Sequence, residues 1–364
     1  MHSIIVSFFV ALMVGFFIIK LSVVNEKTLD YELNGAQKFH SHPVPRIGGL
    51  AIFIAVAAGA GLAYWRAPHI GAWIFLLLLS STLAFGSGIL EDWTKNVGVL
   101  YRLIFTLLSA VVGYFLLHAA IVRIDVSFID SCLKFAPVSL LFTVLCVAGI
   151  ANGINIIDGF NGLAGAISIF IALSLAYVSM QVGDAHVTTA ALVLAGATAG
   201  FMIWNYPFGL IFLGDGGAYF LGFMLAELAV LLIARNPQVS AWYAALLMIY
   251  PAFEVIFSIY RKKFVRGISP GIPDGVHLHM LVFKRLVRWT LGTQGARAKT
   301  RRNALTSPYL WLLSLTAIIP ATLFWHSKWV LVGFCALFVV GYTWLYAQIV
   351  RFNAPQWMIL RKKK

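Results

Sequence analysis

Charged residues are scarce in this sequence. Only 11% of the 364 residues are Asp, Glu, Lys or Arg, whereas 61% are hydrophobic; soluble domains average about a quarter charged and about 45–50% apolar. The period-two alternation of a membrane β-barrel is absent. Apolar runs of about 20 residues recur instead, each long enough to cross a bilayer as a helix. The composition excludes a soluble enzyme and predicts an all-α, polytopic integral membrane bundle, with residues 1–364 forming a single domain.

Cysteine is also scarce, which excludes two further classes of protein. Cys132, Cys146 and Cys335 are scattered and odd in number, so neither a disulfide framework nor a zinc site is expected. No RNA- or DNA-binding module is present, so the net charge of +14 does not predict a nucleic-acid partner. That charge predicts attraction to anionic membrane lipids instead.

About eleven membrane spans are expected from the apolar runs. Their limits are 3–24, 47–65, 70–90, 103–122, 138–157, 163–181, 187–203, 211–234, 241–260, 308–325 and 329–350. The connections on one side are the predicted loops 25–46, 91–102, 158–162, 204–210 and 261–307. Together with the C-terminal tail, these loops hold 21 of the 27 Lys and Arg residues. Because Lys and Arg mark cytoplasmic loops, the N-terminus is predicted to lie outside and the C-terminus in the cytoplasm.

Four of the thirteen acidic residues lie at the predicted cytoplasmic border of three different spans. They are Glu91 and Asp92 in "GILEDW", Asp158 in "NGINIIDGFNGLAG", and Asp215 in "FLGDGGAYF". A carboxylate at this depth is costly unless it faces protein, water or a cation. Each one alone fits an ordinary helix cap. Together they predict a site in which hard oxygen ligands hold Mg²⁺, or Mn²⁺ in its place.

Glycines and basic residues accompany these acids. Glycines are expected to leave backbone N–H groups open to a phosphate; they are Gly159, Gly162, Gly214, Gly216 and Gly217. Two loops on the same side, "KFHSHPVPRIGG" and "RGISPGIPDGVHLHM", supply His and Arg residues. The pair His277 and His279 suits phosphate better than metal, because neither a Cys nor a third His lies nearby.

Five motifs in this order resemble the polyprenyl-phosphate N-acetylhexosamine-1-phosphate transferase superfamily across nearly the full length. They are "KFHSHPVPRIGG", "GILEDW", "NGINIIDGFNGLAG", "WNYPFGLIFLGDGGAYFLG" and "SPGIPDGVHLHM". The resemblance implies transfer of a HexNAc-1-phosphate from a UDP-sugar, by default UDP-GlcNAc, to undecaprenyl phosphate, with release of UMP. It further implies the initiating step of a cell-surface polysaccharide in the bacterial inner membrane, with the active site on the cytoplasmic face. It leaves a homodimer open.

The resemblance also assigns roles to residues. Asp215 matches a metal-binding aspartate, Asp92 a residue that deprotonates or positions the lipid phosphate, and Asp158 a second catalytic candidate. Glu91 takes the first place of the acidic pair, where an aspartate is usual. Expected contacts to the nucleotide sugar come from Asn155, Asn161, Asn205, Phe212 (stacking on uracil), His277 and His279. Expected phosphate contacts come from Lys38, His40 and Arg102, which match positions of the family. Arg46 and Arg266 are added because of the positive charge of their loops. Which carboxylate acts as a base, if any, stays open.

A secondary transporter is the alternative from another class. Glu227 and Glu254 lie inside predicted spans, and several spans are interrupted by glycine, as in transporters. Transporter halves usually repeat, however, and the five motifs show no internal repeat. Four acids also lie at one border rather than at mid-membrane, so the sequence favours the enzyme.

Overall fold

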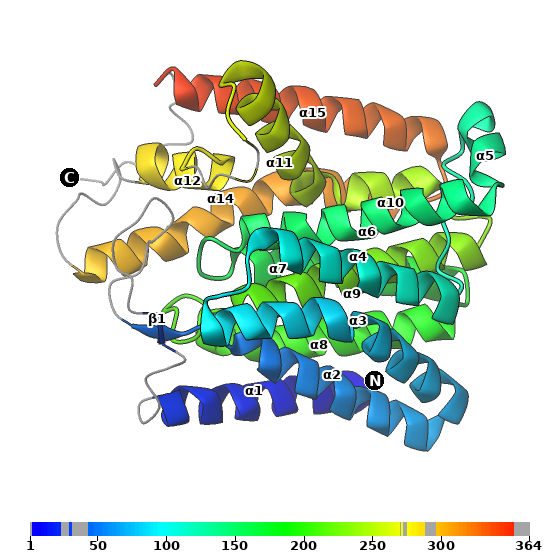
Figure 1. Cartoon of the computed structure of the whole chain (residues 1–364), viewed down its shortest axis with the longest axis horizontal. Helices are drawn as coiled ribbons and strands as arrows, with labels where there is room; N and C mark the ends of the chain where they lie inside the picture. Colours follow the sequence, from blue (N-terminus) through cyan, green and yellow to red (C-terminus); the bar gives the residue numbers. More distant parts are fainter. Residues whose placement is uncertain are drawn as a thin grey trace.

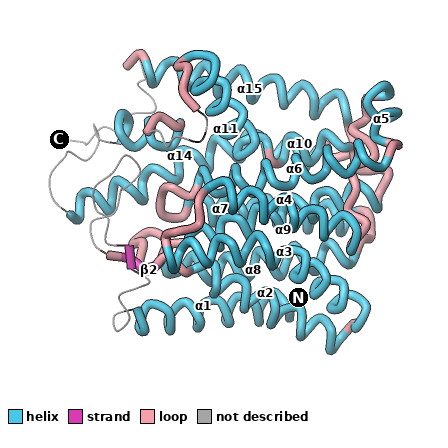
Figure 2. The backbone as a smooth tube through the Cα atoms, in the orientation of Figure 1, coloured by secondary structure: helices cyan, strands magenta, loops and turns pink. Residues whose placement is uncertain are grey.

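Long helices running side by side build the structure, as the computed structural model shows for residues 2–22, 29–30, 43–269, 271, 275–287 and 296–352 (Figures 1 and 2). Ten of the helices in this part of the chain are long and apolar enough to cross a membrane, or eleven with one bent pair counted as a span. Strands are confined, in the same residues, to one two-residue antiparallel pairing. The predicted all-α polytopic bundle is confirmed.

The helices and strands have the following bounds. The first half of the chain contains α1 (His2–Ser22), β1 (Leu29–Asp30), β2 (Val44–Pro45), α2 (Gly48–Arg66), α3 (Pro68–Thr94), α4 (Val99–Leu116), α5 (Ser127–Leu133), α6 (Ala136–Ile157) and α7 (Leu163–Gln181). The second half contains α8 (Ala185–Asn205), α9 (Gly214–Arg235), α10 (Ala241–Leu247), α11 (Ile249–Tyr260), the π-helical turn η2 (Arg261–Val265), α12 (Leu278–Leu281), a second π-helical turn η3 (Val282–Val287), α14 (Ala296–Leu323) and α15 (Lys328–Val350).

Ten of the predicted spans each correspond to one helix and the span 241–260 to the pair α10 and α11, but three boundaries were predicted wrongly. Helix α3 continues to Thr94, so Glu91 and Asp92 lie in its last turns and not in a loop. Helix α4 ends at Leu116, and the apolar residues after it form an irregular connection. The predicted loop 261–307 contains η2, α12, η3 and the first turns of α14. Apolar composition indicates which residues lie in a membrane, whereas the ends of a helix depend on local backbone hydrogen bonding. The two limits therefore need not coincide in either direction.

Helix α9 is the centre of the bundle. In its most apolar window 89% of the residues are buried, against 22% in α1. Its first turn lies directly against the backbones of two neighbours: a Cβ on Gly49 of α2 would come within 2.3 Å of Gly217, and one on Gly88 of α3 within 2.5 Å of Gly216. Small residues permit such close approach of helices. This packing fixes where α9 begins, and with it Asp215.

One span is broken in the middle. Helices α10 and α11 meet at Met248 with a bend of 71°. Pro251 has no N–H to donate to the carbonyl four residues earlier, and its ring crowds that carbonyl, which favours a break in the helix here. The sequence "MIYPAF" had been predicted as part of one continuous span. The bend directs α11 and η2 away from the axis of α10 (Figure 1).

The two ends of the bundle differ. We call the end where α3 and α6 finish and α9 begins the site end; it also carries β1, β2 and α12, on the left of Figure 1. The opposite end carries α5 and the irregular segment 117–126 (Figure 1). Asp125 ties that segment to α10, because its Oδ2 accepts hydrogen bonds from the Ser240 hydroxyl and the Ala241 N–H, both at 2.8 Å.

Candidate active site

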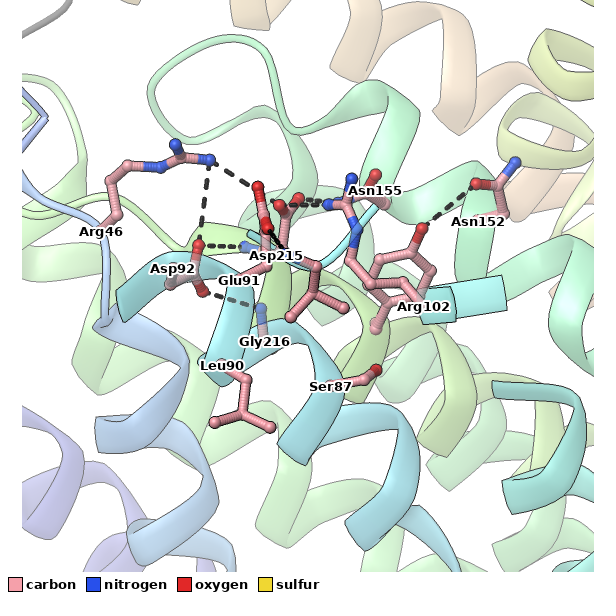
Figure 3. Close-up of polar contacts among 12 residues, drawn as sticks. Arg46, Ser87, Leu90, Glu91, Asp92, Arg102, Asn152, Asn155, Asp215 and Gly216 are labelled. Carbon is pink, nitrogen blue, oxygen red and sulfur yellow. Dashed lines mark hydrogen bonds and ion pairs between the residues drawn. The ribbon is translucent and has the colours of Figure 1, made fainter. Parts of the chain in front are cut away.

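Asp92 acts as a cap for a different helix. Its side chain is fully buried, and its two carboxylate oxygens accept hydrogen bonds from the backbone N–H groups of Asp215 and Gly216, each at 2.9 Å (Figure 3). The first N–H groups of a helix have no partner within it, and the positive end of the helix dipole favours a carboxylate. Asp92 on α3 therefore holds the first turn of α9, where Asp215 lies.

Asp215 lies among three nitrogen-bearing side chains (Figure 3). Its Oδ1 accepts a hydrogen bond from Asn155 Nδ2 at 2.6 Å, and its Oδ2 pairs with the guanidinium of Arg102. Arg46 lies between the two acids, with Nη2 at 3.8 Å from both Asp92 Oδ1 and Asp215 Oδ2. Residues from the β2–α2 connection and from α3, α4, α6 and α9 thus meet in one cluster.

Arg46 is held in place by a short backbone ladder. The N–H of Phe212 donates to the carbonyl of Pro45 at 2.8 Å, and the N–H of Gly48 donates to the carbonyl of Phe212 at 3.0 Å. The segment before α2 is therefore paired with the segment before α9. Gly214, with a φ of +76°, completes this junction, because a Cβ there would come within 1.8 Å of the Arg46 carbonyl.

Asp158 follows the last residue of α6 and belongs electrostatically to the same cluster. The residue as a whole is half-buried, whereas its carboxyl lies deep among protein atoms. This burial, followed by repulsion from Asp215 and Asp92, raises the pKa of the Asp158 carboxyl well above its usual range, against the opposing effect of Arg46. The site therefore brings together more carboxylates than its arginines neutralise.

Glu91 has a local partner. Its Oε2 accepts a hydrogen bond from the N–H of Val97 at 2.7 Å, and so joins the end of α3 to the turn before α4. An aspartate is one methylene shorter. The longer side chain of Glu91 thus makes a structural hydrogen bond to Val97. The catalytic role predicted for Glu91 stays a prediction.

The glycines do not form the open phosphate cradle that the sequence suggested. The N–H of Gly216 is bonded to Asp92, and that of Gly162 donates to Asn205 Oδ1 at 2.6 Å. Gly216 and Gly217 serve the close packing of α9 against α3 and α2. The sequence prediction was wrong for Gly162 and Gly216 because the missing side chains make room for protein, not for a ligand.

Two of the predicted nucleotide-binding asparagines hold loops together. Asn205 accepts from Gly162 and donates from Nδ2 to the Ile211 carbonyl at 2.7 Å, and so joins the α6–α7 turn to the α8–α9 connection. Asn161 donates from Nδ2 to the Pro207 carbonyl at 3.1 Å. Both side chains are buried, whereas Phe212 is half-buried beside Arg46. Their contact with a nucleotide stays a prediction.

The predicted basic residues divide into three groups. Arg46 and Arg102 belong to the cluster, whereas Arg266 is exposed at the end of η2. Lys38 and His40 lie outside the residues that the structure describes. The histidine pair lies next to the cluster: His279 Nε2 is 3.3 Å from the position that a Cβ on Gly159 would take.

Two polar residues of the site carried no assignment from the sequence. The hydroxyl of Tyr219 on α9 donates to Asn152 Oδ1 at 3.5 Å, and the Arg102 guanidinium lies 5.9 Å from the centre of the Tyr219 ring. Asn152 lies three residues before Asn155, on the same face of α6. The signal for Asn152 was its place in the polar motif at the end of a span, and for Tyr219 its spacing of four residues from Asp215.

The donor atoms of this cluster suit a hard divalent cation. Within the described ranges no three His, Cys, Asp or Glu side chains are arranged as a ready metal centre. Mg²⁺, however, usually takes only one or two carboxylates and completes its shell with water and substrate phosphate. Asp215 and Asp158 are two such carboxylates, and their mutual repulsion is what a cation would relieve. In this structure the two Asp215 oxygens are bound by Asn155 and Arg102.

Comparison with known proteins shows what this chain is similar to. Residues 73–233 match the family described as glycosyl transferase family 4. A probable undecaprenyl-phosphate N-acetylglucosaminyl 1-phosphate transferase of Bacillus subtilis is 28% identical over 296 residues, which cover 77% of each chain. An undecaprenyl-phosphate alpha-N-acetylglucosaminyl 1-phosphate transferase of Thermotoga maritima is 28% identical over 74% of this chain and 78% of its own. A phospho-N-acetylmuramoyl-pentapeptide-transferase of Staphylococcus carnosus is 26% identical over 60% and 71%.

Fold and site together define a polytopic membrane protein with a charged, oxygen-rich site at one end of its helix bundle. The family match over residues 73–233 and the similar transferases support placing this chain in the polyprenyl-phosphate N-acetylhexosamine-1-phosphate transferase superfamily. The matched residues 73–233 contain Asp92, Arg102, Asp158 and Asp215, so the family likeness and the acidic cluster coincide.

Proposed function

We propose that this protein transfers a HexNAc-1-phosphate from a UDP-sugar to undecaprenyl phosphate. UDP-GlcNAc is the first candidate donor, because the relatives from Bacillus subtilis and Thermotoga maritima carry N-acetylglucosamine in their names. A phosphate oxygen of the lipid attacks the phosphorus next to the sugar. The bond from that phosphorus to the bridging oxygen breaks, and the oxygen leaves with UMP. The observation that carries the proposal is the convergence of Arg46 and Arg102 on Asp215 beside Asp158.

The charges in the cluster support a reaction between two anions. An attack of phosphate on a diphosphate is opposed by charge repulsion, so catalysis consists mainly of alignment and neutralisation. Asp215 and Asp158 would hold Mg²⁺, or Mn²⁺ in its place, and the ion would neutralise phosphate charge. Once a cation compensates Asp215, Arg46 and Arg102 are available to the phosphates. An arginine suits this role because its donors match phosphate oxygens in pairs.

An apolar groove supports the lipid acceptor. A cavity of about 680 Å³ runs between α6, α9, α10, α11 and α15. Its wall on α6 includes Leu145 and Gly149, and the spacing of four and then three residues continues along the same helix face to Asn152. At the opposite end of the bundle, segment 120–124 lines it. A prenyl chain lying in this groove would place its phosphate at the level of the acidic cluster.

The proposed setting follows from the same chemistry. The lipid phosphate lies at headgroup level, and a UDP-sugar arrives from the cytoplasm, so only the cytoplasmic border of the bacterial inner membrane offers both. Positive residues at the site end agree with that orientation. The product, undecaprenyl-diphosphate-HexNAc, would start a cell-surface polysaccharide such as O-antigen or common antigen. A homodimer is compatible with this proposal.

UMP release is the direct test. Purified protein with undecaprenyl phosphate and Mg²⁺ is expected to release UMP from one or more UDP-HexNAc sugars, and to release none without the lipid. The panel comprises UDP-GlcNAc, UDP-GalNAc, UDP-FucNAc and UDP-QuiNAc. Radiolabelled sugar should appear in the lipid fraction in equal amount. A folded sample that releases no UMP with any of these sugars would contradict the proposal and favour the transporter.

Cysteine labelling tests the groove separately from turnover. Cys146 and Cys335 line the groove, and Cys132 is exposed on α5 at the other end of the bundle. In variants that keep one cysteine each, undecaprenyl phosphate at about nine-tenths occupancy is expected to slow labelling of Cys146 and Cys335 by an apolar maleimide about tenfold. Cys132 is the control and should label at an unchanged rate. Equal protection of all three, or of none, would show that the chain lies elsewhere.

A further inference from the structure

Glu254 is a carboxylate buried inside a membrane span, and the reaction as described does not use it. It lies on α11, six residues after the bend at Met248, and its exposed fraction is 1%. An ionisable residue at such a place is expensive and is usually retained for a function. Glu227 on α9 is the second such residue, and neither of its carboxyl oxygens has a hydrogen-bond partner among the described residues. Glu254 differs from Glu227 because it faces histidines.

The two histidines of the "HLH" motif share this carboxylate. His277 Nδ1 lies 3.0 Å from Glu254 Oε2, a hydrogen-bond distance, and His279 Nδ1 lies 3.9 Å from Glu254 Oε1. The two imidazole rings are stacked, with centres 5.4 Å apart and planes inclined by 11°. Both histidines are buried as well. The carboxylate thus holds the His277 ring, and the stacked His279 ring presents its Nδ1 to the same carboxylate.

The opposite edge of the pair faces the candidate site. Since both Nδ1 atoms point towards Glu254, both Nε2 atoms point away from it. His279 Nε2 is the atom nearest to the missing Cβ of Gly159, at 3.3 Å, and Gly159 directly follows Asp158. The carboxylate, the histidine pair and the turn at the end of α6 therefore lie in sequence from the interior of the span to the site.

The charge of Glu254 fixes the orientation of the His277 ring. A carboxylate at hydrogen-bond distance from Nδ1 keeps a proton on that nitrogen, so the ring is held with Nε2 on the opposite edge. The other titratable groups interacting here are Tyr250 and Tyr342, which interact with Glu254 directly, and Arg261, which acts on Tyr342.

We propose that Glu254 is a positioning residue for donor binding: its carboxylate holds the His277 ring through Nδ1, beside His279, so that the Nε2 edge of the pair faces the nucleotide sugar. The proposal rests on the proposed function for the identity of the ligand. The geometry of the Glu254–His277 pair stands without it. Glu254 on α11 would thus act on the site through the histidines. The bend at Met248 matters for this role because it sets the direction of the helix that carries Glu254.

The kinetic test uses Glu254→Gln, with Glu227→Gln as the matched control. Both substitutions remove a buried carboxylate inside a span and keep the shape of the side chain. Glu254→Gln is expected to raise the KM for the UDP-sugar about tenfold or more, as for the loss of a charge-assisted hydrogen bond, with a smaller change in kcat. Glu227→Gln should leave both constants within about twofold. Equal effects of the two variants on KM, or an unchanged KM in Glu254→Gln, would overturn the proposal.

The spectroscopic test does not depend on turnover. In ¹⁵N-histidine spectra of the full chain, His277 Nδ1 is expected to carry a proton that is hydrogen-bonded to Glu254 in the parent protein, and this hydrogen bond should weaken in Glu254→Gln. Glu254→Asp, which keeps the charge on a shorter side chain, should retain the proton on Nδ1 and part of the affinity. A His277 signal from the neutral form protonated on Nε2 alone, in the parent protein, overturns the proposal even if no variant folds. If UMP release fails with every sugar while these spectra behave as expected, the function is wrong and the positioning of the histidines stands.

Discussion

Asp215→Asn is expected to lower lipid-dependent UMP release by on the order of 10³-fold, and excess Mg²⁺ should not restore it. Asparagine keeps the size of the side chain and one oxygen but removes the charge that a cation would bind, and the electrostatic contribution of a bound metal is several kcal/mol. The substitution also leaves Arg102 without the carboxylate that it pairs with. Turnover measured over a wide range of Mg²⁺ concentration, with the thermal midpoint of the same sample, checks both consequences.

The control for Asp215→Asn removes a carboxylate at the other end of the bundle. Asp130 on α5 accepts a hydrogen bond from the N–H of Ile124 at 2.6 Å and lies on the opposite end of the molecule from the cluster (Figure 1). Asp130→Asn should leave turnover within about twofold. Substantial activity of Asp215→Asn at saturating Mg²⁺ would remove Asp215 from the metal site and leave the cluster to the arginines and Asp158.

The spans were predictable because their signal is local. About 20 successive apolar residues determine a membrane helix with no knowledge of its neighbours, so ten predicted spans each have one helix and the eleventh has the bent pair α10 and α11. The errors arose where apolar composition and helical structure do not coincide. The residues after Leu116 are apolar but irregular, with His118 and Asp125 at positive φ. The bend at Met248 was indicated only by Pro251, and proline also lies inside the single helix α14.

The members of the site were predictable from motifs, but their contacts were not. Asp92 and Asp215 are 123 residues apart, and a motif does not say that the carboxylate of one binds the backbone N–H of the other. The sequence accordingly indicated a chemical role for Asp92, whereas the structure adds that it fixes the start of α9. The glycines of "GDGG" misled for the same reason, because a missing side chain suits a ligand and a neighbouring helix equally well.

Glu254 illustrates what an isolated acidic residue in a span can and cannot indicate. Its place inside a span favoured the transporter alternative and left its role open, and its nearness to His277 in the fold was not visible because α11 and α12 are separated by a long connection. Glu227 carries the same signal, and a Cβ on Gly113 of α4 would come within 2.1 Å of its Oε1. The same residue type thus has a histidine partner in one helix and packs closely against a glycine in another.

Asp158→Asn is expected to make the interaction with Mg²⁺ much less dependent on pH. The pKa of the Asp158 carboxyl is well above its usual range because of burial and repulsion from Asp215 and Asp92, so a proton occupies it in the metal-free protein far above pH 4. A cation must displace that proton. Apparent Mg²⁺ affinity of the parent protein should therefore rise by up to about tenfold per pH unit while Asp158 titrates. In Asp158→Asn this dependence should be largely lost, as measured by Mg²⁺-induced shifts of the thermal midpoint between pH 5 and 8.

The same residue determines the sign of the stability change in Mg²⁺-free buffer. A carboxyl whose pKa is higher in the folded than in the unfolded state prefers to fold protonated. Its contribution to stability is complete below the unfolded pKa of about 3.9 and is lost as the pH rises through the folded pKa. The thermal midpoint of the parent protein should thus fall as the pH rises from 5 to 8, and that of Asp158→Asn should fall less. Mg²⁺ should remove most of the difference, since it replaces the proton as the partner of Asp158. Parallel pH profiles of the two proteins, with and without Mg²⁺, would mean that the cation and Asp158 do not meet, and would leave Asp215 as the remaining carboxylate ligand.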